Sequence, residues 1–246
     1  MGLQFESVGF GRKSHEMIKK AMFYDFDGII IDSISESYYL SKEVFFGFAI
    51  LGPEEKEIKS LFYKYRGLVG PSYQFCILME SIKKYMNNEI GNIPNTFNYL
   101  DKKISNNKKK KFEFLFFQTR RFNQSNIKDW LQLHTLTDFG RTLVSKSLDH
   151  HYIITTKDKR SVDLLLKYFD IHPKKIYDRE FYEKMDSKGN IISDFLNSTD
   201  FDKAVFIDDS IDHLKSVNDN RVDCYFGDWG YGENDKNSSF PVYKFS

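Results

Sequence analysis

Cysteine is scarce in this chain of 246 residues. Its two cysteines, Cys76 and Cys224, stand far apart and form no Cys-x-x-Cys pair, so the sequence predicts neither a disulfide framework nor a cysteine zinc site. Long apolar runs are also lacking, because the longest, residues 44–51, is less than half of the roughly 20 residues that span a membrane. We therefore expect no membrane partner.

A charge excess of either sign is absent as well. Lys and Arg number 36 and Asp and Glu 35, and this net charge of +1 disfavours a dedicated nucleic-acid or anionic-membrane binder. The first residues, MGLQFESVGFGRKSHE, contain no apolar signal core, so the expected location is the cytoplasm. With 41% apolar and 29% charged residues, the chain can bury one sizeable core that carries a smaller unit.

Strand and helix patterns alternate through the last hundred residues. The expected strands are 151–155, 175–178, 204–207 and 222–226, and the expected helices are 161–169, 189–196 and 211–217. A further apolar strand, residues 21–24, stands near the start of the chain. Strands that alternate with helices predict a parallel sheet covered on both faces.

The segment between these strands has a helical pattern and no convincing strand. Its expected helices are 35–51, 54–65, 72–86 and 108–122. The predicted fold class is therefore α/β, a Rossmann-like parallel sheet core with an inserted all-helical cap. The expected divisions are an N-terminal arm (1–20), the core (21–33 and 150–246) and the cap (34–149).

Two carboxylates follow the first expected strand, in Asp25-Phe-Asp27-Gly28. Residues i and i+2 of an extended segment point the same way, so Asp25 and Asp27 can face one ligand. Carboxylates held that close repel each other unless a cation or a shared proton relieves them. Mg²⁺ suits this role because it takes oxygen ligands and keeps phosphate in its shell. Turn chemistry alone is the alternative explanation of this pair.

Donors for an anion stand at two later points of the chain. Thr155 and Thr156 end the second strand and offer hydroxyl and backbone donors. A lysine near the start of the 189–196 helix could complete the set, with Lys188 as first choice and Lys184 in reserve. Each of these residues alone is ordinary strand-end or surface composition.

Acidic residues also end the apolar strand 204–207. Asp208 and Asp209 are candidate metal ligands, with a helix N-cap as the alternative role. In an open α/β sheet, ligands bind at the carboxyl ends of the strands. Acids, threonine donors, a lysine and more acids on one such edge predict a Mg²⁺-phosphate site.

The same residues carry a resemblance to a known family. The run from Phe23 to Ser33 resembles the first motif of the haloacid dehalogenase-like hydrolase superfamily, particularly its phosphoglycolate phosphatase and β-phosphoglucomutase branch. The second, third and fourth motifs are matched by Ile153–Lys157, Lys188 and Val205–Ser210, and Trp229-Gly-Tyr-Gly232 is also similar to that branch. The helical insertion stands at the family's cap position.

The resemblance implies a role for each matched position. Asp25 would attack phosphorus and form an aspartyl-phosphate, and Asp27 would act as general acid and base. Thr155, Thr156 and Lys188 would hold the phosphoryl oxygens. The implied Mg²⁺ ligands are Asp25, Asp27 through its carbonyl, and the Asp208-Asp209 pair, of which the pattern favours Asp209.

The residue at position 27 narrows the implied chemistry. The family's dehalogenases lack an acid there and its ion-pumping ATPases have threonine, so Asp27 indicates a phosphatase or a phosphomutase. We expect a Mg²⁺-dependent phosphatase that hydrolyses a small phosphorylated metabolite, either a sugar phosphate or a phosphoglycolate-like compound. A β-phosphoglucomutase-like enzyme and a non-catalytic binding module on the same fold are the alternatives. Arg66 is a candidate cap residue that contacts the substrate.

Overall fold

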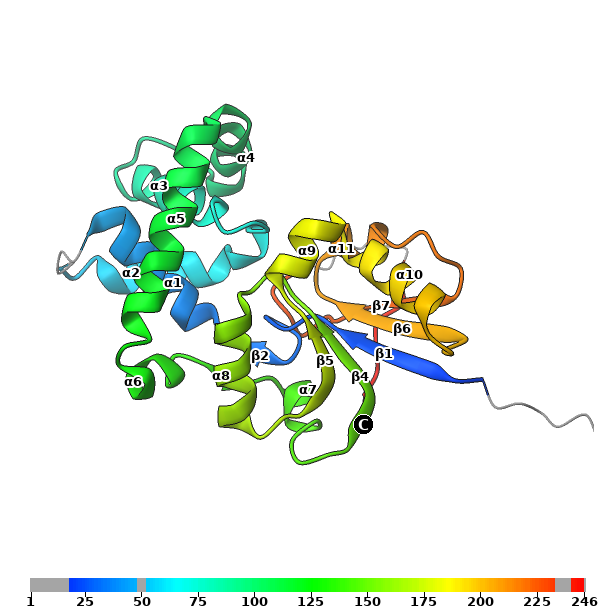
Figure 1. Ribbon diagram of the computed structural model, residues 1–246. Coiled ribbons are helices and arrows are strands. Elements are labelled where there is room, and N and C mark those ends of the chain that lie inside the picture. Colours follow the sequence, from blue (N-terminus) through cyan, green and yellow to red (C-terminus); the bar gives the residue numbers. More distant parts are fainter. Residues whose placement is uncertain (1–17, 48–51, 233–239, 246) are drawn as a thin grey trace, which may run out of the picture.

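A parallel five-stranded sheet forms the centre of the computed structural model, which describes residues 18–47, 52–232 and 240–245 (Figure 1). The strand order is β5-β4-β1-β6-β7, and every neighbouring pair is parallel. The strands are β1 (Lys20–Tyr24), β4 (Leu148–Ile154), β5 (Pro173–Tyr177), β6 (Lys203–Asp208) and β7 (Val222–Phe226). The predicted α/β class is confirmed, and all five strand ends share one edge of the sheet.

Helices cover both faces of this sheet. The helices that follow β4 are α8 (Lys159–Phe169), α9 (Arg179–Met185), α10 (Lys188–Ser198) and α11 (Ile211–Lys215). Successive strand residues point to opposite faces, so Phe23 of β1 joins a cluster with Phe195 of α10 while Tyr24 joins one with Leu165 of α8. The alternation of strands and helices predicted for this part of the chain is confirmed.

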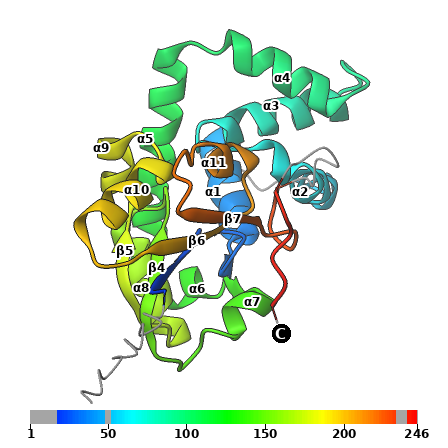
Figure 2. The ribbon, with the colours of Figure 1, turned by 90° about the vertical axis from the view of Figure 1, so that its right-hand side faces the viewer.

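The helical cap lies beside the sheet and has an apolar core of its own (Figures 1 and 2). Its elements are α1 (Ile34–Phe46), α2 (Glu55–Lys64), the short 3-10 helix η1 (Arg66–Leu68), α3 (Gln74–Met86), α4 (Ile93–Lys103) and α5 (Asn106–Asn123). Phe75 stacks between Phe62 and Phe116, with ring centroids 5.6 and 5.4 Å away. The aromatic residues of α5 are therefore partly cap core. Among the described residues, no helix is long and apolar enough to cross a membrane.

Several details of the insertion differ from the expectation. The prediction of no strand there is wrong, because β3 (Thr135–Leu136) pairs antiparallel with β2 (Ile31–Asp32). A strand of two residues is too short to produce an alternating pattern. Helix α4 was not predicted, and it is capped by Asn92, whose side chain accepts from the Asn95 amide. Residues 48–51 of the expected first helix and residues 1–17 of the expected arm lie outside the described residues.

The last part of the insertion packs with the sheet rather than with the cap. It contains α6 (Ile127–Leu131) and α7 (Asp138–Arg141). Trp130, Phe139 and Leu143 belong to the same apolar cluster as Ile153 of β4. The expected division at residue 149 stays a prediction, and this packing supports a cap that ends near the end of α5.

Candidate active site

The ends of β4, β1 and β6 bring the first group of expected residues to one edge. Pairing continues past the strands, since the Asp25 amide donates to the Ile207 carbonyl at 2.9 Å and the Thr155 amide to the Tyr177 carbonyl at 2.9 Å. Asp208 is the last residue of β6, the neighbour of β1. Asp25 and Asp208 therefore follow adjacent strands.

A buried lysine completes this group. The N-cap of α10 is Ser187, whose hydroxyl accepts from the Asn190 amide at 3.0 Å. Lys188 follows it, and its Nζ lies 2.7 Å from both Asp25 Oδ1 and Asp208 Oδ2. Only 1% of Lys188 is exposed, whereas Lys184 is exposed on α9. The structure thus brings Lys188, and not Lys184, to the acids.

Asp209 joins the two carboxylates that the lysine contacts. One oxygen from each of Asp25, Asp208 and Asp209 lies within 4.8 Å of the others, and all three residues are buried. Burial, which one lysine does not offset, raises the pKa of Asp25 to about 7. Burial and the Asp208 charge raise the pKa of Asp209 to about 6. Burial also acts on Asp208, but Lys188 and His213 outweigh it and lower its pKa.

This donor set fits a hard divalent cation. Its oxygen ligands are those that Mg²⁺ prefers. The three carboxylates can carry more negative charge than one lysine balances, so a bound cation would relieve the repulsion between them. The side chain of Asp27 does not belong to this group. That the backbone carbonyl of Asp27 binds the metal stays a prediction.

A glycine-containing loop after β7 encloses Asp209. The Tyr231 amide donates to Asp209 Oδ2 at 2.5 Å. A Cβ added to Gly230 would lie 2.4 Å from that same oxygen, and one added to Gly232 would lie 1.7 Å from the Asp209 carbonyl oxygen. The Trp-Gly-Tyr-Gly pattern thus has a physical reason, because only glycine lets this backbone approach Asp209 so closely.

Asp27 faces a different lysine. Its Oδ1 accepts from the Ser33 hydroxyl and lies 3.0 Å from Lys157 Nζ. Burial raises the pKa of Asp27, but Lys157 and the Ser33 hydrogen bond outweigh it, so the pKa is lowered overall. The two carboxylates of the Asp-x-Asp pair therefore have opposite pKa shifts.

The two threonines differ in their surroundings. Thr155 is buried and its hydroxyl accepts from the Lys157 amide at 3.0 Å, whereas Thr156 is exposed. Their expected contact with a phosphoryl group stays a prediction. Both stand at the end of β4, beside the strand that leads to Asp25.

Arg66 is a cap residue that contacts the core. Its guanidinium lies 4.5 Å from the Tyr231 ring centroid and 4.9 Å from that of Phe75, and Nη1 donates to the Val69 carbonyl at 2.9 Å. The charge of Arg66 also acts on Asp209, where it opposes the raised pKa. The expected cap residue therefore stands beside the loop that encloses the acidic group.

Two polar residues that contact the site's carboxylates, Lys157 and His213, were not among the predicted site residues. Lys157 stands two positions after Thr155 in the loop that follows β4, and its place directly after an expected strand end was the available signal. His213 lies in the first turn of α11, and its Nδ1 is 3.1 Å from Asp208 Oδ2. Its place in the helix that follows Asp208-Asp209 predicts a position near the site, but the sequence does not indicate the contact with Asp208.

Comparison with known proteins gives the fold. No family model and no curated protein matches the chain. A haloacid dehalogenase-like family hydrolase from Streptococcus pneumoniae is 17% identical with a TM-score of 0.56, covering 92% of this chain and 94% of that one. A "putative phosphoglycolate phosphatase" from Lactobacillus delbrueckii subsp. bulgaricus is 13% identical with a TM-score of 0.61, covering 94% and 95%.

A third solved structure agrees with these two. The "predicted phosphatase" from Clostridium acetobutylicum is 16% identical with a TM-score of 0.57, covering 92% of this chain and 93% of that one. The chain therefore has the fold of the haloacid dehalogenase-like hydrolases over nearly its whole length, cap included. The fold expected from the motif resemblance is confirmed.

Proposed function

We propose that this protein is a Mg²⁺-dependent phosphatase that hydrolyses a small phosphate monoester. The observation that carries the proposal is the buried contact between Asp25 and Lys188, beside the carboxylates of Asp208 and Asp209. A nucleophilic carboxylate, a fixed cation and a metal-binding acidic group are what phosphoryl transfer through a covalent intermediate requires. The fold shared with proteins described as phosphatases supports the same conclusion.

In the first step, an oxygen of Asp25 attacks phosphorus and the bond from phosphorus to the leaving oxygen breaks. Lys188, already placed at Asp25, balances the negative charge of the phosphoryl oxygens, and Thr155 donates to them. Mg²⁺ bound by Asp25 and Asp209 would neutralise further negative charge on the transferring group. The product of this step is an aspartyl-phosphate on Asp25.

Asp27 moves the proton in both steps. It donates a proton to the leaving oxygen, and then takes one from the water that attacks phosphorus and releases Asp25. The contact with Lys157 holds Asp27 in its ionised form, which is the form that accepts the proton from water. Protonation of Asp27 for the first step therefore requires this contact to loosen.

The substrate would bind between the strand ends and the cap. Arg66 is the cap cation placed beside the Asp209 loop, so it is the residue we assign to contact the rest of the ester. A sugar phosphate or a phosphoglycolate-like compound is the proposed substrate class, in line with the description of the Lactobacillus delbrueckii structure.

The test is phosphate release from a panel of small phosphate esters, with and without Mg²⁺, with Asp25→Asn as control. Release that needs Mg²⁺ and is lost in the variant is the expected result. Isomerisation of a sugar phosphate with little free phosphate would instead indicate a phosphomutase. If the folded protein catalyses neither reaction, the remaining alternative is a non-catalytic binding module.

A further inference from the structure

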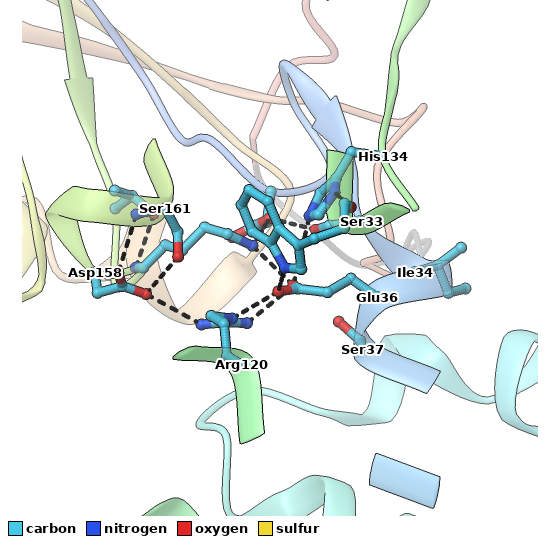
Figure 3. Close-up of polar contacts among 12 residues, drawn as sticks. Ser33, Ile34, Glu36, Ser37, Arg120, His134, Asp158 and Ser161 are labelled. Atoms are coloured by element: carbon cyan, nitrogen blue, oxygen red, sulfur yellow. Dashed lines mark hydrogen bonds and ion pairs between the residues drawn. The ribbon is translucent and has the colours of Figure 1, made fainter. Parts of the chain in front are cut away.

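A row of alternating charges connects Asp27 to the cap. Lys157 Nζ lies 3.0 Å from Asp27 Oδ1 and 3.2 Å from Glu36 Oε2. Two guanidinium nitrogens of Arg120 donate to the Glu36 carboxylate, at 2.7 and 3.0 Å. The third guanidinium nitrogen lies 3.4 Å from Asp158 Oδ2. We call these five residues the charge ladder. Figure 3 shows Glu36 facing Arg120, with Asp158 on the far side of the guanidinium.

The ladder is buried at its centre. Glu36, Lys157 and Arg120 are 0, 4 and 6% exposed. Glu36 also accepts from the Trp130 indole at 2.9 Å. Arg120, Lys157 and Trp130 together donate to both oxygens of this carboxylate, and loss of Arg120 or Lys157 would leave buried charge with too few partners.

The ladder lies where the chain enters and leaves the cap. Glu36 is in the first turn of α1, and Arg120 is in the last turn of α5. Lys157 and Asp158 belong to the core loop after β4, and Asp158 is fixed there as the N-cap of α8, accepting from the Ser161 amide at 3.0 Å. Lys157 therefore contacts a core residue and a cap residue at the place where the chain passes between the two parts.

We propose that the charge ladder is a joint that couples the position of the cap to the orientation of the Asp27 carboxylate. Glu36 and Arg120 hold Lys157 from the cap side, and Lys157 holds Asp27 from the core side. These three are positioning residues, and the inference rests on the proposed function, in which Asp27 carries the proton. It adds a means by which closure of the cap prepares Asp27 for its task.

A double-mutant cycle tests the connection to Asp27. We expect Lys157→Met to lower kcat for alkyl phosphates about 10- to 100-fold with little change in KM, and Lys157→Arg to retain part of the activity. Added to Asp27→Asn, Lys157→Met should cause no further loss, because it acts through Asp27. Lys159→Met is the matched control, since that lysine is exposed and pairs with Asp163. An equal loss in both backgrounds would overturn the proposal.

A distance measurement tests the joint without turnover. Spin labels at Tyr99 on α4 and Tyr168 on α8, which are 59 and 52% exposed, would report the spacing of cap and core after both native cysteines are replaced. We expect Glu36→Gln and Arg120→Met to broaden the distance distribution, and the exposed neighbour change Arg121→Met to leave it unchanged. If Arg120→Met does not fold, Arg120→Lys takes its place in the experiment, because it keeps the positive charge but loses the paired hydrogen bonds to Glu36.

The two arms separate failure of the joint from failure of the phosphatase proposal. An unchanged distance distribution in the ladder variants would overturn the joint, whatever the activity. A broadened distribution in a protein that hydrolyses no ester would support the joint and remove the proposed function alone.

Discussion

Lys188 and Asp25 form a buried ion pair in which Nζ lies 2.7 Å from Oδ1. Burial alone would lower the pKa of the lysine, but Asp208 and Asp25 outweigh it, and the pKa is raised overall. The ammonium is thus charged and in place before any substrate arrives. It stabilises the fold of the strand ends and balances the charge of the proposed nucleophile.

Replacing this lysine should therefore affect both stability and activity. We expect Lys188→Met to lower the free energy of unfolding by about 3–5 kcal/mol, because it leaves two buried carboxylates without their cation. Phosphate release should be lost as well. Urea denaturation and an ester assay measure the two effects. Lys184→Met, at an exposed position on α9, is the matched control, and equal losses in both variants would contradict the assignment.

Asp25→Asn should separate chemistry from folding. The change removes one of three crowded carboxylates, so we expect the protein to stay folded. Because the same change removes the proposed nucleophile, turnover should fall by about 1,000-fold or more. Phosphate release gives the activity, and circular dichroism and thermal unfolding give the fold. Turnover close to that of the unchanged protein would exclude Asp25 as the nucleophile.

The sequence predicts the acids of this site better than the contacts around them. Asp25 and Asp208 end apolar strands of a parallel sheet, and such ends must share an edge, so their proximity follows from pattern alone. The choice between Lys188 and Lys184 depends instead on where α9 ends and α10 begins, which a pattern locates only to within a few residues.

Contacts between distant segments could not be predicted where they lie outside the strand ends. Lys157 and Glu36 are 121 positions apart, and neither stands in a pattern that indicates a partner. The hairpin of β2 and β3 has two residues in each strand, too few for a periodic signal. The placement of Arg66 against Tyr231 likewise depends on how the cap sits on the core.

Metal binding should depend on pH. The pKa of Asp25 is raised to about 7 and that of Asp209 to about 6, chiefly by burial, so Mg²⁺ must displace protons from these groups in acid. We expect Mg²⁺ affinity to rise about tenfold per pH unit between pH 6 and 7 while one proton is released. Calorimetric titrations in buffers of different ionisation enthalpy would count the protons. An affinity that does not change with pH would contradict the assignment of these ligands.

The same shifts set the sign of the effect on stability. Because the pKa values of Asp25 and Asp209 in the folded protein lie above the ordinary value of 3.8, folding favours their protonated forms. Their contribution to the stability of the metal-free protein is therefore lost as pH rises from about 4 to about 7. Added Mg²⁺ should raise the melting temperature more at pH 7.5 than at pH 5.5, and the reverse order would contradict the shifts.

The loop that encloses Asp209 offers a test of the metal site that replaces none of the proposed ligands. A Cβ at Gly232 would lie 1.7 Å from the Asp209 carbonyl oxygen, so Gly232→Ala must push the two backbones apart. We expect Mg²⁺ affinity to fall about 10- to 100-fold, as for other changes to groups that orient metal ligands. Titration calorimetry measures this. Gly91→Ala is the matched control, because nothing lies within 4 Å of its added Cβ. Unchanged Mg²⁺ affinity in Gly232→Ala would show that the position of Asp209 does not determine metal binding.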